Sequence, residues 1–185
     1  IRETAGEPIY LNERSRSWWE SGGPRDMLLA QNQDFGPQKL GFEDLSRLPT
    51  EPSALTNVIR ERAQSADPPL HDEMFVVIGD YLRQQSAPPQ LRAALYKIAA
   101  GIPGVELVGE IRDRAGRAGV GVAMTTTYTG LKQRHILIFD PRTSALLAEE
   151  TLLLEKPSWS DVQPPVLIGY ATYLESGVVE SLPLD

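Results

Sequence analysis

The spacing of apolar residues divides the chain into three regions. Between residues 51 and 100, apolar side chains recur every three or four positions, which is the period of an α-helix. From residue 104 onward they recur every second position, which is the period of a β-strand. Before residue 34, short apolar runs are separated by glycine and proline. The pattern predicts strands within 8–33, helices within 51–100 and further strands within 104–183.

The middle region is expected to contain three helices, because proline-containing segments interrupt its apolar stripe twice. Thr50 or Ser53 can cap the first helix, and Pro52 suits its first turn. The second helix is expected over 74–85 and the third over 90–100. All three carry an aliphatic stripe that has to be buried against another element.

The flanking regions are expected to pair into one antiparallel sheet. Residues 14–20 are interpreted as an extended, aromatic part of the N-terminal strands. Asp113–Gly116 and Asp140–Thr143 have the composition of tight turns between later strands. Strands joined by such short turns must be antiparallel, since parallel neighbours need a longer crossover. The expected fold class is α+β, with a curved antiparallel sheet and three helices packed on one face.

Composition and charge limit the classes of partner. With 185 residues, 41% of them hydrophobic, the chain is expected to form one domain over 1–185. Its net charge of −7 and its scattered arginines disfavour nucleic acid and anionic membranes, whose binding relies on clustered Lys and Arg. The lack of cysteine excludes disulfides and thiolate chemistry. Because the chain begins at Ile1 rather than Met, a signal or membrane anchor is expected upstream.

No group of residues has the spacing of a catalytic or metal site. His71 lacks a second ligand at metal-binding spacing, and His135 is expected at the surface, at a strand end. The serine hydrolase motif Gly-x-Ser-x-Gly does not occur. Glu149 and Glu150 are neighbours on a strand, so they point to opposite faces. We expect no catalytic residue, metal or cofactor, while a carboxylate pair across strands stays open as the basis of a hydrolase.

The glycine-rich run at 116–121 has the composition of a phosphate-binding loop without its context. Such a loop follows a strand and opens a helix, whereas this run lies between a predicted turn and a predicted strand. Its glycines are expected to mark the turn and a strand position where a bulge or a close backbone approach leaves no room for a side chain.

Aromatic side chains are the candidates for ligand binding. On a strand, one of Trp18 and Trp19 would face the core and the other the opposite face. The pair can serve packing alone, or it can form the wall of an apolar cleft between sheet and helices that holds a lipid-like ligand or a partner peptide. Phe75, Tyr81 and Tyr96 on the predicted helices are further candidates for this cleft.

Several segments together resemble a family of actinobacterial proteins whose function is not established. The resemblance covers roughly residues 14 to 183 and is carried by 48–55, 75–83, 88–96, 102–105, Asp113-x-x-Gly116-Arg117-x-Gly119-Val120 and Phe139-Asp140-Pro141-x-Thr143. It implies a transmembrane helix upstream and an exported C-terminal domain, hence an extracytoplasmic location with a tether to the cytoplasmic membrane. It supplies no catalytic residues.

The strand–helix–strand order is also similar to the half-barrel of the bacterial lipoprotein carrier LolA and of the sensor RseB, a likeness of fold alone.

One position departs from the pattern of the actinobacterial family. Ser144 stands where the family usually has glycine. Serine tolerates the left-handed backbone conformation less well, so a different turn geometry is expected there.

Three functions follow as hypotheses. The leading one is a non-enzymatic binding or sensing domain of the cell envelope, whose partner is an apolar small molecule or an envelope protein. The second is a regulatory domain of an anti-sigma-type membrane protein that signals through protein contact. The third is a hydrolase whose carboxylates the sequence does not reveal as a pair. An open apolar cavity between sheet and helices would favour the ligand-binding form of the first hypothesis.

Overall fold

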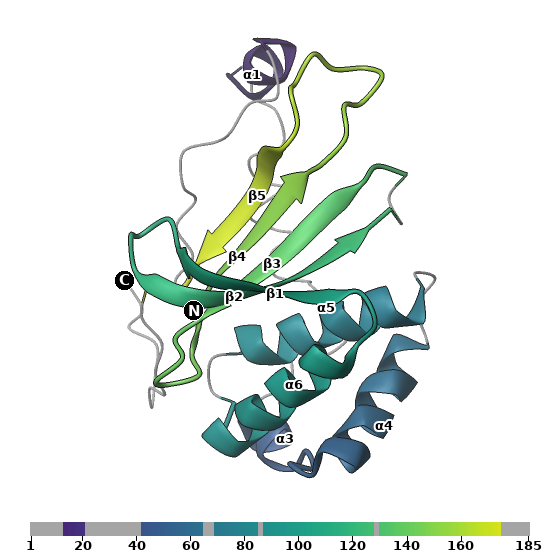
Figure 1. Ribbon diagram of the computed structural model, residues 1–185, viewed down its shortest axis with the longest axis vertical. Coiled ribbons are helices and arrows are strands. Elements are labelled where there is room, and N and C mark those ends of the chain that lie inside the picture. Colours follow the sequence, from purple (N-terminus) through teal and green to yellow (C-terminus); the bar gives the residue numbers. More distant parts are fainter. Residues whose placement is uncertain (1–12, 21–41, 65–68, 85–86, 128–129, 175–185) are drawn as a thin grey trace.

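The computed structural model describes residues 13–20, 42–64, 69–84, 87–127 and 130–174 (Figure 1). Its five strands form one open antiparallel sheet in the order β1-β2-β3-β4-β5, so each strand pairs with its neighbour in sequence. The predicted α+β class and antiparallel meander are confirmed. The elements are α1 (Glu13–Glu20), α3 (Phe42–Ser46), α4 (Pro52–Ala63), α5 (Leu70–Arg83), α6 (Pro89–Gly101), β1 (Val105–Arg112), β2 (Ala118–Thr126), β3 (Gln133–Phe139), β4 (Leu146–Leu153) and β5 (Val166–Thr172).

The N-terminal prediction of an extended segment at 14–20 is wrong, because these residues form helix α1. Arg16 and Glu20 lie one helical turn apart, and Arg16 Nε donates to Glu20 Oε1 at 3.1 Å. Glu13 occupies the first turn, where a negative charge interacts favourably with the helix dipole. The other residues expected as strands within 8–33, and those expected after residue 174, lie outside the described residues.

Helix α4 begins where the prolines predicted, but with a different cap. Pro52 is in the first turn, as expected. The capping residue is Glu51 rather than Thr50 or Ser53, since Glu51 Oε2 accepts from the Ala54 backbone N–H at 2.8 Å. The Ser53 hydroxyl donates to the same carboxylate. These hydrogen bonds, from Ser53 first and Ala54 second, lower the pKa of Glu51.

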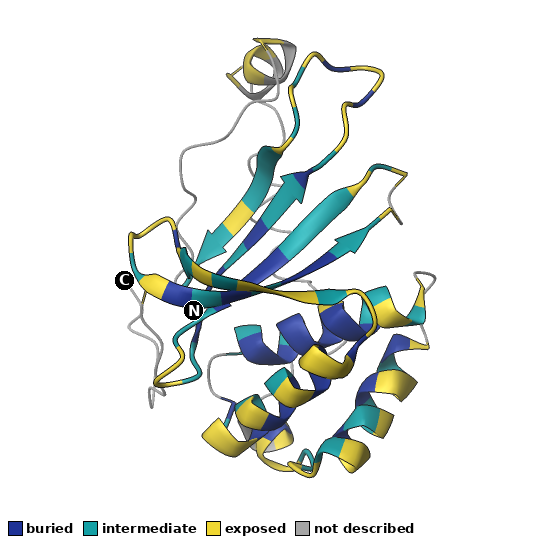
Figure 2. Ribbon diagram, in the orientation of Figure 1, coloured by how far each residue is buried: buried dark blue, intermediate teal, exposed yellow. Residues whose placement is uncertain are grey.

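Helices α4, α5 and α6 form a layer against one face of the sheet (Figure 1). Helix α6 contacts β1 and α5 contacts β2, whereas α4 packs mainly on α5 and α6. In Figure 2 the buried positions lie on the helix sides that face one another and the sheet. Helices α5 and α6 therefore pack on the sheet as predicted, and α4 forms the outer part of the layer. The shared core includes Leu55, Ile59, Ile78, Leu82, Leu91, Leu95, Met124, Leu137 and Leu146.

A second buried cluster lies on the opposite face of the sheet. Ala123 and Ile136 belong to it, while their chain neighbours Met124 and Leu137 belong to the helix core. Neighbouring strand residues point to opposite faces, so the two clusters are on the two sides of the sheet. Ile111, near the tip of the β1–β2 hairpin, packs against the second cluster. The hairpin therefore covers part of the face that the helices do not.

Arg117 links the β1–β2 hairpin to β4 and to the residue that follows β5. Its Nη2 donates to the backbone oxygen of Leu147 in β4 at 2.9 Å, and its Nη1 donates to that of Tyr173, just after β5, at 2.8 Å. In a flat sheet, β2 and β5 would be three strand spacings apart, roughly 14 Å. An arginine side chain does not reach that far, so these bonds require the end of the β1–β2 hairpin to bend over towards β4 and β5.

The carboxylate of Asp113 holds this arginine in place. Its side chain is fully buried, with 0% exposure, and Oδ2 accepts from Arg117 Nε at 2.7 Å. Oδ1 accepts from the backbone N–H groups of Ala115 and Arg117. Gly116 has a positive φ of 80° in the same turn. The predicted hairpin turn is confirmed, and the motif Asp113-x-x-Gly116-Arg117 is explained by this turn and its attachment.

Gly119 occupies the position of close approach that the glycine-rich run predicted. A Cβ atom there would lie 2.8 Å from Ile138 Cγ2 and 2.9 Å from the backbone oxygen of Phe139. The second contact is with backbone, which cannot rotate away as a side chain can. The prediction of a glycine required by close packing is confirmed.

Ser144 adopts the left-handed conformation, with a φ of 58°, so the expected change of turn geometry does not occur. Two side chains of α6 hold the turn. Arg92 Nε donates to Ser144 Oγ at 3.1 Å and Arg92 Nη2 to the backbone oxygen of Thr143 at 3.0 Å. The hydroxyl of Tyr96 donates to the backbone oxygen of Ser144 at 3.1 Å. These bonds offset the cost of a non-glycine residue at positive φ.

We predict that Arg117→Gln destabilises the fold by about 3 kcal/mol or more, because it leaves the buried Asp113 carboxylate without its cation. Urea unfolding measures this change. Arg142→Gln, which removes an exposed arginine from another hairpin, is the control and should change the free energy of unfolding by less than about 0.5 kcal/mol. Equal effects of the two substitutions would contradict the assigned role of Arg117.

We also predict that Gly119→Ala destabilises the fold by about 1–3 kcal/mol through overpacking. Gly79→Ala is a matched control. Gly79 is buried in α5, and the nearest atom to an added Cβ would be Leu137 Cδ2 at 3.7 Å, an ordinary contact. Because alanine favours the helix interior, this control should be neutral or stabilising by up to about 1 kcal/mol. Thermal unfolding of both variants tests the pair.

Candidate functional site

Side chains occupy the space between sheet and helices, where an apolar cleft was one of the two alternatives for the aromatic residues. Phe75 and Tyr81 are 4% and 3% exposed and belong to the same buried cluster as Met124 and Leu137 of the sheet. Arg62 lies over the Tyr81 ring, 5.4 Å from its centroid. Packing therefore accounts for both aromatic candidates.

The remaining aromatic candidates are placed differently. Tyr96 is half-buried, its ring centroid lies 4.4 Å from that of Phe139, and its hydroxyl is used by the turn at Ser144. Burial raises the pKa of Tyr96. Trp18 and Trp19 lie in α1 rather than in a strand, and their side chains are outside the described part of the structure.

A charged cluster links the end of α5 to the sheet. Arg83 binds both oxygens of Glu149 in β4, each at 2.8 Å, and its Nη1 donates to Asp80 at 2.6 Å. The Tyr173 hydroxyl donates to the same glutamate. Burial raises the pKa of Asp80, and Arg83 opposes this effect. Asp80 and Glu149 therefore share one guanidinium, which links α5 to β4.

Glu149 and Glu150 have separate partners, as predicted from their adjacent positions on a strand. Glu150 is buried and accepts from Arg114 Nε of the β1–β2 hairpin at 3.0 Å. Glu149 faces the helices and binds Arg83. The two carboxylates lie on opposite faces and cannot contact one substrate.

His135 is not at the surface end of a strand, which corrects the prediction. It is the third residue of β3 and is half-buried, with Nδ1 3.3 Å from the hydroxyl oxygen of Thr151 on β4. Burial lowers the pKa of His135, while Asp72 and Glu149 act in the opposite direction. Asp72 accepts a hydrogen bond from the Thr126 hydroxyl. The histidine is therefore part of the polar contact between α5 and the sheet.

Within the described residues, no group of three or more His, Asp or Glu side chains is arranged to hold a metal ion. No helix in the same part of the chain has the length and apolar character needed to cross a membrane.

A pocket of about 420 Å³ opens where the N-terminal halves of α4 and α5 meet the C-terminal end of α6. Buried apolar side chains form its floor, including Met74, Ile98 and Ile102. Arg60, His71 and Lys97 line it with exposed side chains. The full lining is Pro52, Ser53, Thr56, Arg60, Leu70, His71, Met74, Lys97, Ile98, Gly101, Ile102 and Pro103.

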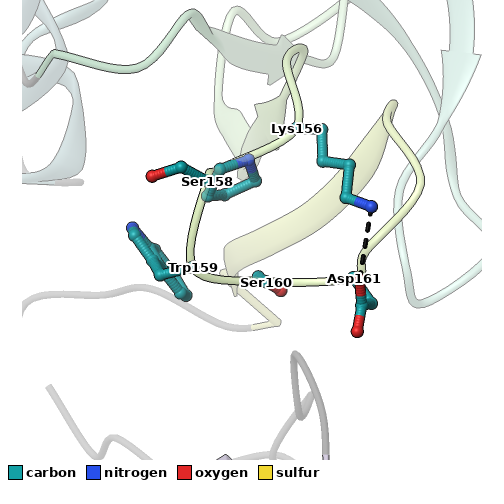
Figure 3. Close-up of a pocket in the computed structure, with 6 residues that line it drawn as sticks. Lys156, Ser158, Trp159, Ser160 and Asp161 are labelled. Atoms are coloured by element: carbon teal, nitrogen blue, oxygen red, sulfur yellow. Dashed lines mark hydrogen bonds and ion pairs between the residues drawn. The ribbon is translucent and has the colours of Figure 1, made fainter.

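A second pocket, of about 360 Å³, lies within the loop between β4 and β5 (Figure 3). One six-residue segment, Lys156 to Asp161, lines it, and an ion pair of 3.3 Å joins the two end residues. Trp159 is 64% exposed beside it. Because a single loop forms this hollow by folding on itself, the pocket at the helix ends is the better candidate for a ligand site.

Sequence reasoning missed the residues of the helix-end pocket. Leu70 and Met74, like Ile98 and Ile102, are four positions apart, which is the spacing of any buried helix stripe. The one signal in the sequence is that the lining positions include no acidic residue. This signal can be recognised only when it is known which helix ends meet.

The His135 environment makes stability depend on pH. The pKa is lowered in the folded state, so below the ordinary value of 6.5 the unfolded chain binds the proton first. The contribution of neutral His135 is therefore complete above pH 6.5 and is lost as the pH falls towards the folded-state pKa.

We predict that the free energy of unfolding falls less between pH 7.5 and 5.5 in His135→Gln than in the wild type. The reduction should be about 1.4 kcal/mol for each unit by which the pKa of His135 differs between the folded and unfolded chain. Urea titrations at several pH values measure it, with His71→Gln as the control at an exposed histidine. If the free energy of unfolding has the same pH dependence in the wild type and in His135→Gln, His135 is not the group responsible.

Comparisons with protein-family models, curated proteins and solved structures found no match to the chain. The resemblance to the actinobacterial family therefore stays a prediction, as do the extracytoplasmic location and the upstream anchor.

Proposed function

We propose that this chain is a non-enzymatic binding or sensing domain of the cell envelope and that it binds an apolar small molecule at the ends of α4, α5 and α6. The observation that carries the proposal is the pocket of about 420 Å³ at that place. Small-molecule sites are concave, mostly apolar and roughly 300–1,000 Å³ in volume, with a few polar groups for orientation. A floor of Met74, Ile98 and Ile102 beneath polar side chains has this composition.

The site differs from the cleft suggested by the aliphatic helix stripes. Those stripes are buried against the sheet, where they form the core. Similarity to LolA-like half-barrels is proposed for the sheet alone, because the bonds of Arg117 bend the end of the β1–β2 hairpin over it. The hairpin covers part of the face away from the helices, so the helices lie outside the concave surface that the hairpin forms with the sheet.

A second candidate function is a regulatory domain that acts through protein contact, as in anti-sigma-type membrane proteins. Exposed apolar residues favour it. Leu107 is 74% exposed on β1, which is an edge strand of the sheet within the described residues, and Val108 beside it is also exposed. Edge strands offer unpaired backbone groups to a partner chain. Pull-down of the full-length protein with recovery of a sigma factor would favour this candidate over ligand binding.

The ligand-binding proposal is tested by filling the pocket. Leu70→Trp places a larger side chain at a half-buried lining position, whereas Val76→Trp makes a similar change on the exposed side of the same helix. Each protein is purified from a host membrane fraction and analysed by native mass spectrometry and lipid extraction. We expect an apolar molecule with the wild type and Val76→Trp, and at least a tenfold loss with Leu70→Trp. Equal retention by both variants, or no bound molecule in the wild type, would count against the proposal.

A further inference from the structure

The helix-end pocket has a charge opposite to that of the whole chain. The chain carries 25 acidic and 18 basic residues, for a net charge of −7. The pocket lining nevertheless includes Arg60 and Lys97, together with His71, and contains neither aspartate nor glutamate. This local reversal indicates a site that attracts an anion.

Four acidic residues adjoin the lining in sequence, Glu51, Glu61, Asp72 and Glu73, and two of them have hydrogen-bond partners outside the pocket. Glu51 precedes the pocket residue Pro52, but it caps α4 through Ser53 and Ala54. Asp72 follows His71, but it accepts a hydrogen bond from Thr126 of the sheet. Neither carboxylate is among the lining residues. Glu61 and Glu73 are not lining residues either, so the lining itself carries basic side chains and no carboxylate.

Arg60 and Lys97 also keep their charge available. Arg60 Nη1 donates to Asn57 Oδ1 at 3.3 Å, and this partner is a neutral amide. Within the described part of the chain, neither Arg60 nor Lys97 forms an ion pair at 4 Å or less. The pair differs in this respect from Arg83, Arg114 and Arg117, which each bind a carboxylate.

The start of α5 also borders the pocket, and Asp72 and Glu73 in its first turn already interact with its positive end. Leu70 and His71 line the pocket and are the first two residues of this 14-residue helix. The N-cap position is Pro69, with no side-chain hydrogen bond to the first turn. Unsatisfied N–H groups at a helix start favour a nearby negative charge. The end of α6 borders the same pocket with the opposite polarity, so the preference for anions depends on Arg60 and Lys97.

We infer that the ligand is a single-chain amphiphile with an anionic headgroup, held at the head by Arg60 and Lys97 and along its chain by Met74, Ile98 and Ile102. This inference rests on the proposed function of the same pocket. The volume of about 420 Å³ is near the lower end of the range for small-molecule sites, which favours one short chain over a two-chain lipid. A carboxylate and a phosphate ester share the required head chemistry.

Four probes with the same ten-carbon chain test the inference by isothermal titration calorimetry below their micelle concentrations. They are decanoate, decyl phosphate, decanol and decyltrimethylammonium. We expect at least one anionic probe to bind ten times more tightly than decanol, and the cationic probe to bind more weakly than decanol. A preference between the two anions supports the inference and identifies the headgroup.

Two double variants separate charge from fold. Arg60→Gln with Lys97→Gln should weaken the anionic probes at least tenfold, to the level of decanol, and leave decanol unchanged. Lys132→Gln with Arg142→Gln removes the same charge from exposed positions outside the pocket and should leave all four probes unchanged. Circular dichroism confirms that both variants are folded.

The outcomes distinguish this inference from the function on which it rests. Equal affinity for all four probes, or unchanged anion binding after loss of Arg60 and Lys97, overturns the anionic headgroup while leaving an apolar ligand site. Binding of none of the probes, with Leu70→Trp also without effect on co-purified molecules, overturns both.

Discussion

The ion pair between Arg117 and the buried Asp113 is the contact on which the position of the β1–β2 hairpin over the sheet depends. A carboxylate with no exposed surface is costly unless its charge and lone pairs are satisfied, and here one guanidinium and two backbone N–H groups satisfy them. The same guanidinium also donates to backbone oxygens of β4 and of the residue after β5. One side chain therefore neutralises Asp113 and bends the hairpin over the sheet. With one corner of the sheet covered by the hairpin, the helix layer occupies the opposite face.

Charged residues in this chain serve two distinct purposes. Those inside the fold join elements that are distant in sequence, as Arg83 joins α5 to Glu149 of β4. The basic residues of the helix-end pocket have no such structural partner among the described residues, and they surround an apolar floor. Cations held beside buried aliphatic side chains are the arrangement expected of a site for an amphiphile, which needs both a charged and an apolar contact.

Much of the fold was predictable because its signals are local. Prolines delimit α4, α5 and α6, and the turns at Asp113 and Asp140 impose antiparallel pairing. Helix α1 was missed because an eight-residue segment carries too little periodicity to oppose its strand-like aromatic residues. The pocket was not predictable at all. Ile98 and Ile102 have the spacing of core residues, and whether such a position faces a neighbouring helix or an opening depends on how three helix ends meet.

The left-handed Ser144 has a mechanical consequence for α6. Arg92 and Tyr96 anchor the first two turns of this helix to the β3–β4 turn, whereas Lys97 to Pro103 border the pocket beyond that anchor. A helix of 13 residues is about 20 Å long and stiff over that length. The serine turn therefore fixes the N-terminal half of α6, and the stiffness of the helix carries that position over to the residues that border the pocket.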